Sequence, residues 1–501
     1  MTPPAQRPPG AILLRGGTVI DGTGSPRYRA DVLVEHGRIQ AVGPGLAGSR
    51  GADVTVFDAG GKVIAPGFID VHTHDDHIVL TAPAMLPKIS QGICTVIVGN
   101  CGISLAPLVR AGTDHALPAP LTLLGDAGGF RFDSLDAYAN AVNAARPAVN
   151  VAALVGHTTL RVDNVADLAR AALPAELDAM CDVLDRAMRD GAIGLSSGVF
   201  YGPAAAADMG ELTALARIAA RHGGVYATHL RDEFEAILAS MEEATEVARG
   251  AGISLVLSHH KCAGPANWGR TRETLAYVEC AGKHQSIGLD AYPYVAGSTV
   301  LRADLVDDVI DILVTWSDTH PQLAGRYLAD IAAGWNCTQR EACERLQPGG
   351  ACYFQMDEAD VQRVLRHPAT MIGSDGLPHD RHPHPRLWGT FPRVLGHYSR
   401  ELKLFGLETA VHKMTGMSAA RFGLDRRGRI EAGFHADLVV LDPEQVGDRA
   451  TFEAPIQASA GIELVFVNGV LSYRAGECLP ARAGHFLPRG RTPRTPVNTP
   501  P

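Results

Sequence analysis

Between residues 64 and 425 the sequence repeats one pattern, a short apolar run rich in β-branched residues followed by a stretch with helical spacing. We interpret eight such runs as strands: residues 68–72, 95–99, 150–155, 192–195, 225–228, 254–258, 286–289 and 370–374. Helical patterns at 176–189, 209–221 and 234–251 separate several of them. Eight strand–helix units predict an α/β fold, a (β/α)8 TIM-like barrel with its functional site at the C-terminal strand ends.

The segments on either side of this region lack the strand–helix repeat. Residues 11–63 and 426–486 read as short strands broken by glycine turns, and we expect them to pair into one small β-sandwich domain. The connection 290–369 is too long for an ordinary loop, so we predict an inserted lid segment at about 295–355. The proline-rich ends, 1–10 and 487–501, are predicted to be disordered tails.

Composition excludes several classes of function. The 501-residue chain has a formal net charge of −9 without charge blocks, so neither nucleic acid nor a membrane surface is indicated as a partner. No apolar stretch is long enough to span a bilayer, and residues 1–10 lack the apolar core of a signal peptide. Nine irregularly spaced cysteines do not form a disulfide framework. We expect a cytoplasmic protein.

Residues able to bind a metal ion stand at five of the eight predicted strand ends. In a strand, alternate side chains point the same way, so His72 and His74 of the first strand can share one ion. The other ends carry Cys101 after the second strand, His229 after the fifth, the pair His259 and His260 with Lys261 after the sixth, and Asp375 after the eighth; Tyr292 follows the seventh. Because all these ends meet at one barrel mouth, the pattern predicts a metal centre there.

These motifs resemble the metal-dependent amidohydrolases, and within that superfamily the N-acyl-D-amino-acid deacylases (D-aminoacylases). The matching segments are 67–76, Gly-Asn-Cys-Gly at 99–102, Gly-Leu-Ser-Ser-Gly at 194–198, Ser-His-His-Lys at 258–261, Asp-Ala-Tyr-Pro-Tyr at 290–294 and Gly-Ser-Asp-Gly at 373–376. The resemblance implies a zinc-dependent hydrolase that cleaves the amide of an N-acyl-D-amino acid, giving a carboxylate and a free D-amino acid. Its partner would be this small-molecule substrate; the oligomeric state stays open.

Many amidohydrolases bridge two metal ions with a carbamylated lysine on the fourth strand. No lysine lies between Lys88 and Lys261, and Lys88 falls in a helical stretch after the first strand, so that bridge cannot form here. Cys101 is the natural substitute, because a thiolate is a strong zinc ligand that the metal itself deprotonates. A hydantoinase-like or dihydroorotase-like enzyme acting on cyclic amides is correspondingly disfavoured. A non-catalytic barrel scaffold is the other alternative.

The resemblance also implies roles for single residues. Cys101, His229 and His259 would hold one tight zinc ion, with His260 on the other face, while His72, His74 and Asp375 would line a second, weaker position. Asp375 would act as the general base, and Tyr292 would donate to the oxygen that becomes anionic. The groups expected to contact the substrate are Arg386, Lys261, Tyr292, Ser298 and Tyr201.

Three neighbouring features are interpreted as non-catalytic. His157 ends the third strand but matches no ligand of the family motifs. Asp232 and Glu233 are expected to begin a helix, where acidic residues suit the N-terminus. The histidines of loop 379–384 are interpreted as polar loop content.

Overall fold

Eight parallel strands form the centre of the computed structural model, which describes residues 10–46, 54–112 and 116–490. Their order is β18-β14-β13-β12-β11-β10-β7-β6. The bounds are β6 (Phe68–Asp70), β7 (Ile93–Val98), β10 (Asn150–Gly156), β11 (Gly194–Gly198), β12 (Val225–His229), β13 (Ser254–Leu257), β14 (Ile287–Ala291) and β18 (Thr370–Ile372). Each coincides with a predicted strand, so the predicted (β/α)8 barrel is confirmed.

The barrel is nearly closed by a seam between its first and last strands. No continuous ladder joins β6 to β18 within the described residues; a single parallel bridge joins Thr73 to Gly376. Next to it the N–H of Asp375 donates to the carbonyl of His72 at 2.8 Å. The seam is thus formed by the loop residues that carry two of the predicted site motifs.

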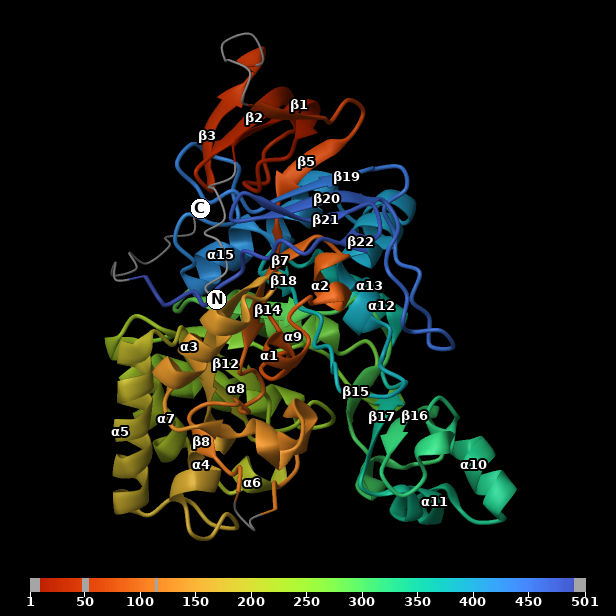
Figure 1. The fold of residues 1–501 in the computed structure, drawn as a ribbon. Helices are drawn as coiled ribbons and strands as arrows, with labels where there is room; N and C mark the ends of the chain where they lie inside the picture. Colours follow the sequence, from red (N-terminus) through yellow and green to blue (C-terminus); the bar gives the residue numbers. More distant parts are fainter. Residues whose placement is uncertain (1–9, 47–53, 113–115, 491–501) are drawn as a thin grey trace.

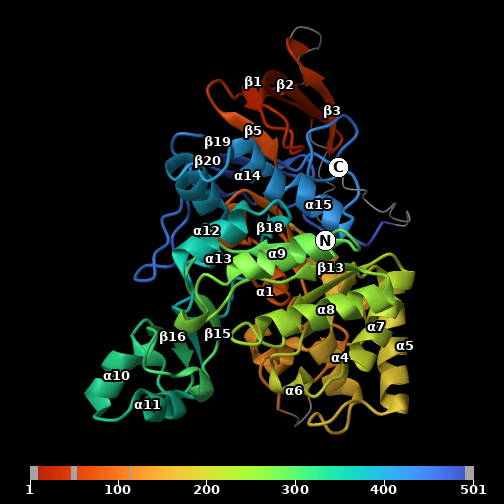
Figure 2. The same ribbon diagram turned by 180° about the vertical axis from the view of Figure 1, so that it is seen from behind.

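Helices cover the outside of the barrel (Figures 1 and 2). Apolar side chains fill its inside. The predicted helices correspond to α5 (Pro174–Asp190), α7 (Met209–Arg221) and α8 (Ile237–Ala251). The others are α1 (Ile78–Thr81), α2 (Leu86–Ile89), α3 (Leu135–Ala145), α4 (His157–Asn164), α6 (Gly202–Ala205), α9 (Thr271–Ala281), α12 (Glu358–Arg366), α13 (Arg386–Arg393), α14 (Leu407–Met414) and α15 (Gly416–Phe422). A π-helix, Val394–Glu401, continues α13. In the described residues no helix has the length and apolar character that crossing a membrane requires.

Both ends of the chain build one mixed sheet above the barrel (Figure 1). Its strands are β1 (Ala11–Val19), β2 (Tyr28–Glu35), β3 (Arg38–Gly43), β4 (Val54–Asp58), β5 (Val63–Pro66), β19 (Leu438–Leu441), β20 (Ile462–Val467), β21 (Val470–Arg474) and β22 (Glu477–Cys478). Side chains from both halves, among them Leu14, Val32, Leu438 and Phe466, share one apolar core. A short separate hairpin pairs β8 (Leu108–Val109) with β9 (Arg131–Phe132).

The predicted insertion is a small lobe with its own core, seen to one side of the barrel in Figure 1. It contains the antiparallel sheet β15-β17-β16 and two helices. The bounds are β15 (Gly297–Val300), β16 (Ile312–Ser317), α10 (Leu328–Trp335), α11 (Gln339–Leu346) and β17 (Gly349–Tyr353). Gly297 pairs with Tyr353, so the lobe leaves and rejoins the barrel at adjacent positions.

Two expected boundaries need correction. β5 extends to Pro66 and pairs with β1 and β19, so the terminal sheet continues past the expected limit at 63. At the other end, Leu487 donates its N–H to Val151 at 2.7 Å and Arg489 donates to Gly191 at 2.9 Å. Residues 487–490 are therefore bound to the barrel and not part of a tail, because their backbone N–H groups find acceptors at its rim. Of the remainder of the two predicted tails, Gly10 is exposed and precedes β1, and residues 1–9 and 491–501 lie outside the described residues.

Candidate metal centre

The predicted metal ligands gather at one end of the barrel. His229 is the last residue of β12, His259 lies just after β13, and Cys101 follows β7 by a short turn. His72 and His74 follow β6, and Asp375 follows β18. All six are buried. Their convergence follows from the parallel barrel, in which every strand ends at the same mouth.

Cys101, His229 and His259 form the first group. Their ligand atoms all lie within 4.8 Å of one another. Nε2 of His259 is 2.9 Å from Nδ1 of His229 and 3.3 Å from Sγ of Cys101. Three converging N and S donors in a buried pocket match the ligand chemistry of a catalytic zinc site, which keeps one position open.

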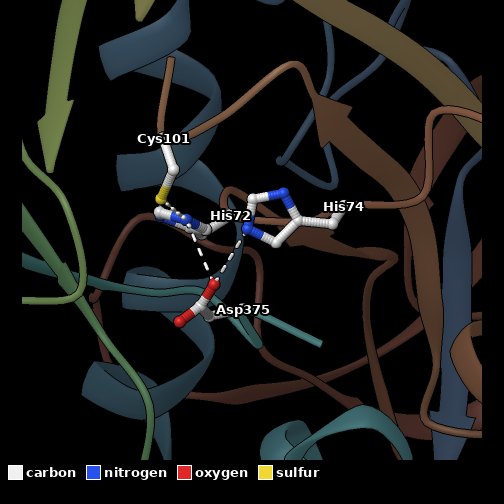
Figure 3. Close-up of side chains that lie close together, drawn as sticks. All are labelled: His72, His74, Cys101 and Asp375. Carbon is white, nitrogen blue, oxygen red and sulfur yellow. Dashed lines mark hydrogen bonds and ion pairs between the residues drawn. The ribbon is translucent and has the colours of Figure 1, made fainter. Parts of the chain in front are cut away.

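His72, His74, Cys101 and Asp375 form the second group (Figure 3). Nε2 of His72 is 3.2 Å from Sγ of Cys101, and Nε2 of His74 is 3.2 Å from Oδ1 of Asp375. Cys101 belongs to both groups, so its sulfur lies between them. In the part of the chain that the structure describes, these are the two groups of side chains arranged to hold a metal ion.

The backbone of three predicted ligands is held in the left-handed region. The φ angles are +51° at Cys101, +35° at His259 and +50° at Asp375. A side chain makes this region unfavourable by about 1–3 kcal/mol, and such strain persists where the surroundings fix it. The chain therefore turns sharply at each of these three residues, shortly after the end of a barrel strand.

The Cys101 turn is fixed by Ser196 on β11. The Ser196 hydroxyl donates to the carbonyl of Gly99 at 2.5 Å and accepts the N–H of Gly102 at 3.0 Å. Gly102 also has a positive φ, and a Cβ there would lie 2.6 Å from the backbone nitrogen of Gly198. The Gly-Asn-Cys-Gly motif thus fits because Gly102 allows close contact with β11 and Gly99 allows close contact with Leu154 on β10.

Two charged groups are held ionised. Burial raises the pKa of the Cys101 thiol, but the positive charges of His72 and His259 outweigh it and hold this pKa well below its usual range. Burial likewise raises the pKa of Asp375, but the Arg386 guanidinium, whose Nη1 lies 2.9 Å from Oδ2, helps to hold it well below normal. A thiolate and a carboxylate are the forms that bind a cation.

Sequence reasoning missed two acidic residues. Glu233 does not begin a helix as expected, since α8 starts only at Ile237. It is instead buried, with Oε1 at 2.7 Å from Nζ of Lys261 and 3.1 Å from Nδ1 of His259. The one sequence signal for this role was the position of Glu233 four residues after the predicted ligand His229. Asp232 does not begin a helix either. Its carboxylate accepts the N–H of Phe234 at 2.7 Å and so caps the turn that precedes α8.

Asp290, the other missed residue, links the two groups of ligands. Its Oδ1 accepts the N–H of His259 at 2.8 Å and lies 3.1 Å from Nδ1 of His72. The first contact supports the left-handed backbone of His259, and the second orients the His72 ring. The motif that contains Asp290 was recognised, but nothing in the sequence shows where its carboxylate points.

A cavity opens onto the predicted ligands. Four predicted substrate contacts, Lys261, Tyr292, Ser298 and Tyr201, line it. Other lining residues come from the barrel loops and from the inserted lobe: Leu123, Phe200, Phe234, Gly297, Thr299, Leu305, Tyr353, Gln355 and Leu377. The hydroxyls of Tyr292 and Ser298 are buried without a hydrogen-bond partner among the described residues.

Arg386, the fifth predicted substrate contact, lies outside this cavity wall. It is fully buried, its guanidinium carbon stands 4.5 Å from the centre of the Tyr292 ring, and one Nη donates to the carbonyl of Ser298 at 3.1 Å. Its Nε finds no acceptor among the described residues. The guanidinium thus lies directly beside two residues of the wall, with its Nε lacking an acceptor among the described residues.

The other histidines considered in the sequence contact groups outside the two groups of predicted ligands. Nε2 of His260 contacts the Thr274 hydroxyl at 2.8 Å, and Nε2 of His157 lies 2.7 Å from Glu211. In loop 379–384, His382 and His384 contact backbone carbonyl groups.

Comparison with known proteins agrees with this geometry. A model of the amidohydrolase family matches residues 55–473. The chain is 52% identical to a D-aminoacylase of Alcaligenes xylosoxydans xylosoxydans over 95% of its length and 97% of the relative's. It is 50% identical to an N-acyl-D-aspartate deacylase of the same organism, covering 96% and 95%. A crystal structure of the N-acyl-D-glutamate deacylase of Bordetella bronchiseptica, complexed with zinc and a phosphonate inhibitor, superimposes with a TM-score of 0.90 at 46% identity, covering 95% and 99%.

The barrel and its strand-end ligands define a metal-dependent hydrolase fold. The chain belongs to the amidohydrolase family and, within it, to the branch of the N-acyl-D-amino-acid deacylases.

Proposed function

We propose that this protein is an N-acyl-D-amino-acid deacylase that hydrolyses the linear amide bond to a carboxylate and a free D-amino acid. The observation that carries the proposal is the convergence of the ligand atoms of Cys101, His229 and His259 at the barrel mouth. The fourth barrel strand, β11, has no lysine that could bridge two metal ions. Near-full-length relatives at about half identity have this activity in their names.

The donor set fits zinc. Cys101, His229 and His259 would hold one ion tightly, and His72, His74 and Asp375, with the shared Cys101, would form a weaker second position. A bound zinc ion would supply Lewis-acid activation of water and of the amide carbonyl. Glu233 and Asp290 would keep His259 in place through their contacts with its ring and its backbone.

Asp375 would move the protons. It lies at the cavity wall and is kept ionised by Arg386, so it can accept a proton from the attacking water. The same carboxyl group can then give that proton to the leaving amine nitrogen. The unpartnered hydroxyl of Tyr292 would donate to the amide oxygen as negative charge develops on it.

The α-carboxylate of the substrate would bind near Lys261 and Arg386. Lys261 is the one lysine or arginine among the described residues that line the cavity. Arg386 has an unused Nε beside Tyr292 and Ser298, and Ser298 offers an unpartnered hydroxyl. Tyr201, whose hydroxyl lies 3.1 Å from that of Thr299, would complete this side.

The rest of the wall suggests which side chain is accepted. It is formed largely by Leu123, Phe200, Phe234, Leu305 and Leu377, and among the described residues Lys261, which already pairs with Glu233, is the one lysine or arginine that lines it. A second carboxylate would therefore be buried without a partner, which is costly. We expect apolar D-amino acids to be preferred over D-aspartate and D-glutamate.

A turnover screen tests the proposal. N-acetyl-D- and L-amino acids and hydantoins would be assayed, with zinc content measured on the same samples. The expected result is turnover of N-acetyl-D-leucine well above the L-isomer and above N-acetyl-D-aspartate. Preferential turnover of hydantoins would favour the cyclic-amide alternative, and zinc without any turnover would favour the scaffold alternative.

We also propose a cytoplasmic location. All nine cysteines are free, as expected in a reducing compartment.

A further inference from the structure

Lys88 is a fully buried lysine that the proposed chemistry does not use. It lies on α2, a short helix between the first two barrel strands, and is 1 % exposed. Its Nζ contacts three acceptors: Oδ2 of Asp70 at 2.9 Å, the hydroxyl of Ser374 at 2.8 Å and Oδ2 of Asp75 at 3.3 Å. Burying an ammonium group is unfavourable unless such partners surround it.

These three acceptors belong to the two sides of the barrel seam. Asp70 ends β6, and Asp75 directly follows His74, whereas Ser374 directly precedes Asp375. The ammonium group therefore bridges the segment carrying the two histidines and the segment carrying the proposed base.

The seam depends on such side-chain contacts because its backbone pairing is minimal. One parallel bridge joins the two segments in the described structure, where other neighbouring strands share a ladder of several residues. Oδ1 of Asp70 accepts the N–H of Ser374 at 2.8 Å and lies 3.4 Å from the N–H of His72. The Asp70 carboxylate thus accepts a backbone N–H across the seam, as a carbonyl group of a neighbouring strand would. Lys88 donates to the other oxygen of the same carboxylate.

We propose that Lys88 is a positioning residue, which fixes the distance between His72 and His74 on one side of the seam and Asp375 on the other. Lys88 contacts none of Cys101, His229 and His259, so its effect falls on the second metal position and on the proposed base. The inference rests on the proposed deacylase function for its kinetic readout, but not for its metal-binding readout.

The test compares Lys88→Met, Lys88→Arg and a matched control, Lys413→Met. Lys413 is also 1 % exposed and donates to the carbonyls of His367 and Thr370 at 2.5 and 3.0 Å, at the opposite end of β18. Metal-free protein would be titrated with Zn²⁺ alone, and kcat and KM would be measured on N-acetyl-D-leucine.

Lys88→Met should retain one tight Zn²⁺ per chain, weaken the second Zn²⁺ roughly 10- to 100-fold, and lower kcat by a similar factor with little change in KM. Lys88→Arg should recover part of both losses, because it restores the charge. Lys413→Met should stay within a few-fold of the wild type in both readouts.

Equal losses in Lys88→Met and Lys413→Met, or no loss in Lys88→Met, would overturn the inference. Should Lys88→Met fail to fold, Ser374→Ala removes one contact of the ammonium while leaving its pair with Asp70. A smaller loss in the same direction is expected, and unchanged kcat and Zn²⁺ binding would overturn the inference. A wild-type protein without deacylase turnover would refute the proposed function, and the Zn²⁺ titration alone would then decide the role of Lys88.

Discussion

Oδ2 of Asp375 lies 2.9 Å from Nη1 of Arg386, and both side chains are buried. The proposed base is thus paired with the cation that was expected to bind the substrate. The two roles are compatible, because Nε of Arg386 has no acceptor among the described residues. The pair also explains why a carboxyl group at this depth keeps its charge.

Replacing Arg386 tests its contact with the substrate. Hydrogen bonds to charged groups contribute about 1.5–3 kcal/mol, so Arg386→Ala should lower kcat/KM for N-acetyl-D-leucine by roughly 10- to 150-fold. Arg386→Lys should recover only part, since a point charge cannot reproduce the planar fork. The loss should be smaller for the corresponding neutral amide. Equal losses for acid and amide would show that Arg386 acts through Asp375 alone.

Removing the shared thiolate tests the metal centre. Cys101→Ala should lose most of the tight zinc and nearly all activity, because ligand and metal stabilise each other. The control is Cys94→Ala, which removes another fully buried thiol from the preceding strand β7. Elemental analysis should show full zinc in the control; full zinc in Cys101→Ala would refute the ligand assignment.

Asp375→Asn tests the proton carrier. The variant should fold and keep the tight zinc, since Asp375 lies outside the Cys101, His229 and His259 group. Its kcat should fall by roughly 10²–10⁴, the usual contribution of a general base. Turnover within a few-fold of the wild type would assign the proton transfer to another group.

The inserted lobe should respond to ligand binding. It supplies Ser298, Thr299, Leu305 and Tyr353 to the cavity, so a bound product would contact it directly. Hydrogen exchange in residues 301–354 should slow when the D-amino acid product is added, because closure excludes water. Identical protection with and without product would contradict a lid role.

The buried Glu211 should make stability depend on pH. Burial raises its pKa, but contacts with His157 and Arg161 lower it to about 2 from 4.5. Because the folded-state pKa lies below the unfolded one, the stabilisation is present above pH 4.5 and is lost as pH falls toward 2; at neutral pH it is roughly 3 kcal/mol.

Glu211→Gln should therefore lower the Tm at pH 7, and its difference from the wild type should shrink as the pH falls below 4.5. Calorimetry at a series of pH values measures this difference, and Glu477→Gln, which changes an exposed residue, serves as control. A difference that stays constant down to pH 3 would contradict the assignment.

The barrel and the convergence of the proposed ligands at its mouth were predictable because both follow from local pattern. Apolar runs mark strands, and a histidine or cysteine at the end of a parallel strand must lie at the mouth. The contacts of Glu233 and Asp290 were not predictable from the sequence. Those of Glu233 depend on how its loop folds back, and those of Asp290 depend on its side-chain rotamer. The burial of Arg386 and the docking of Leu487 likewise arise from tertiary packing, which leaves no periodic trace in the sequence.

The inserted lobe leaves and rejoins the barrel at the paired residues Gly297 and Tyr353, and its apolar core is separate from that of the barrel. Mutations inside it can accumulate without moving a metal ligand, since none of the six proposed ligands belongs to it. Evolution can thus change the specificity of such an enzyme by exchanging this module, while the hydrolytic machinery stays as it is.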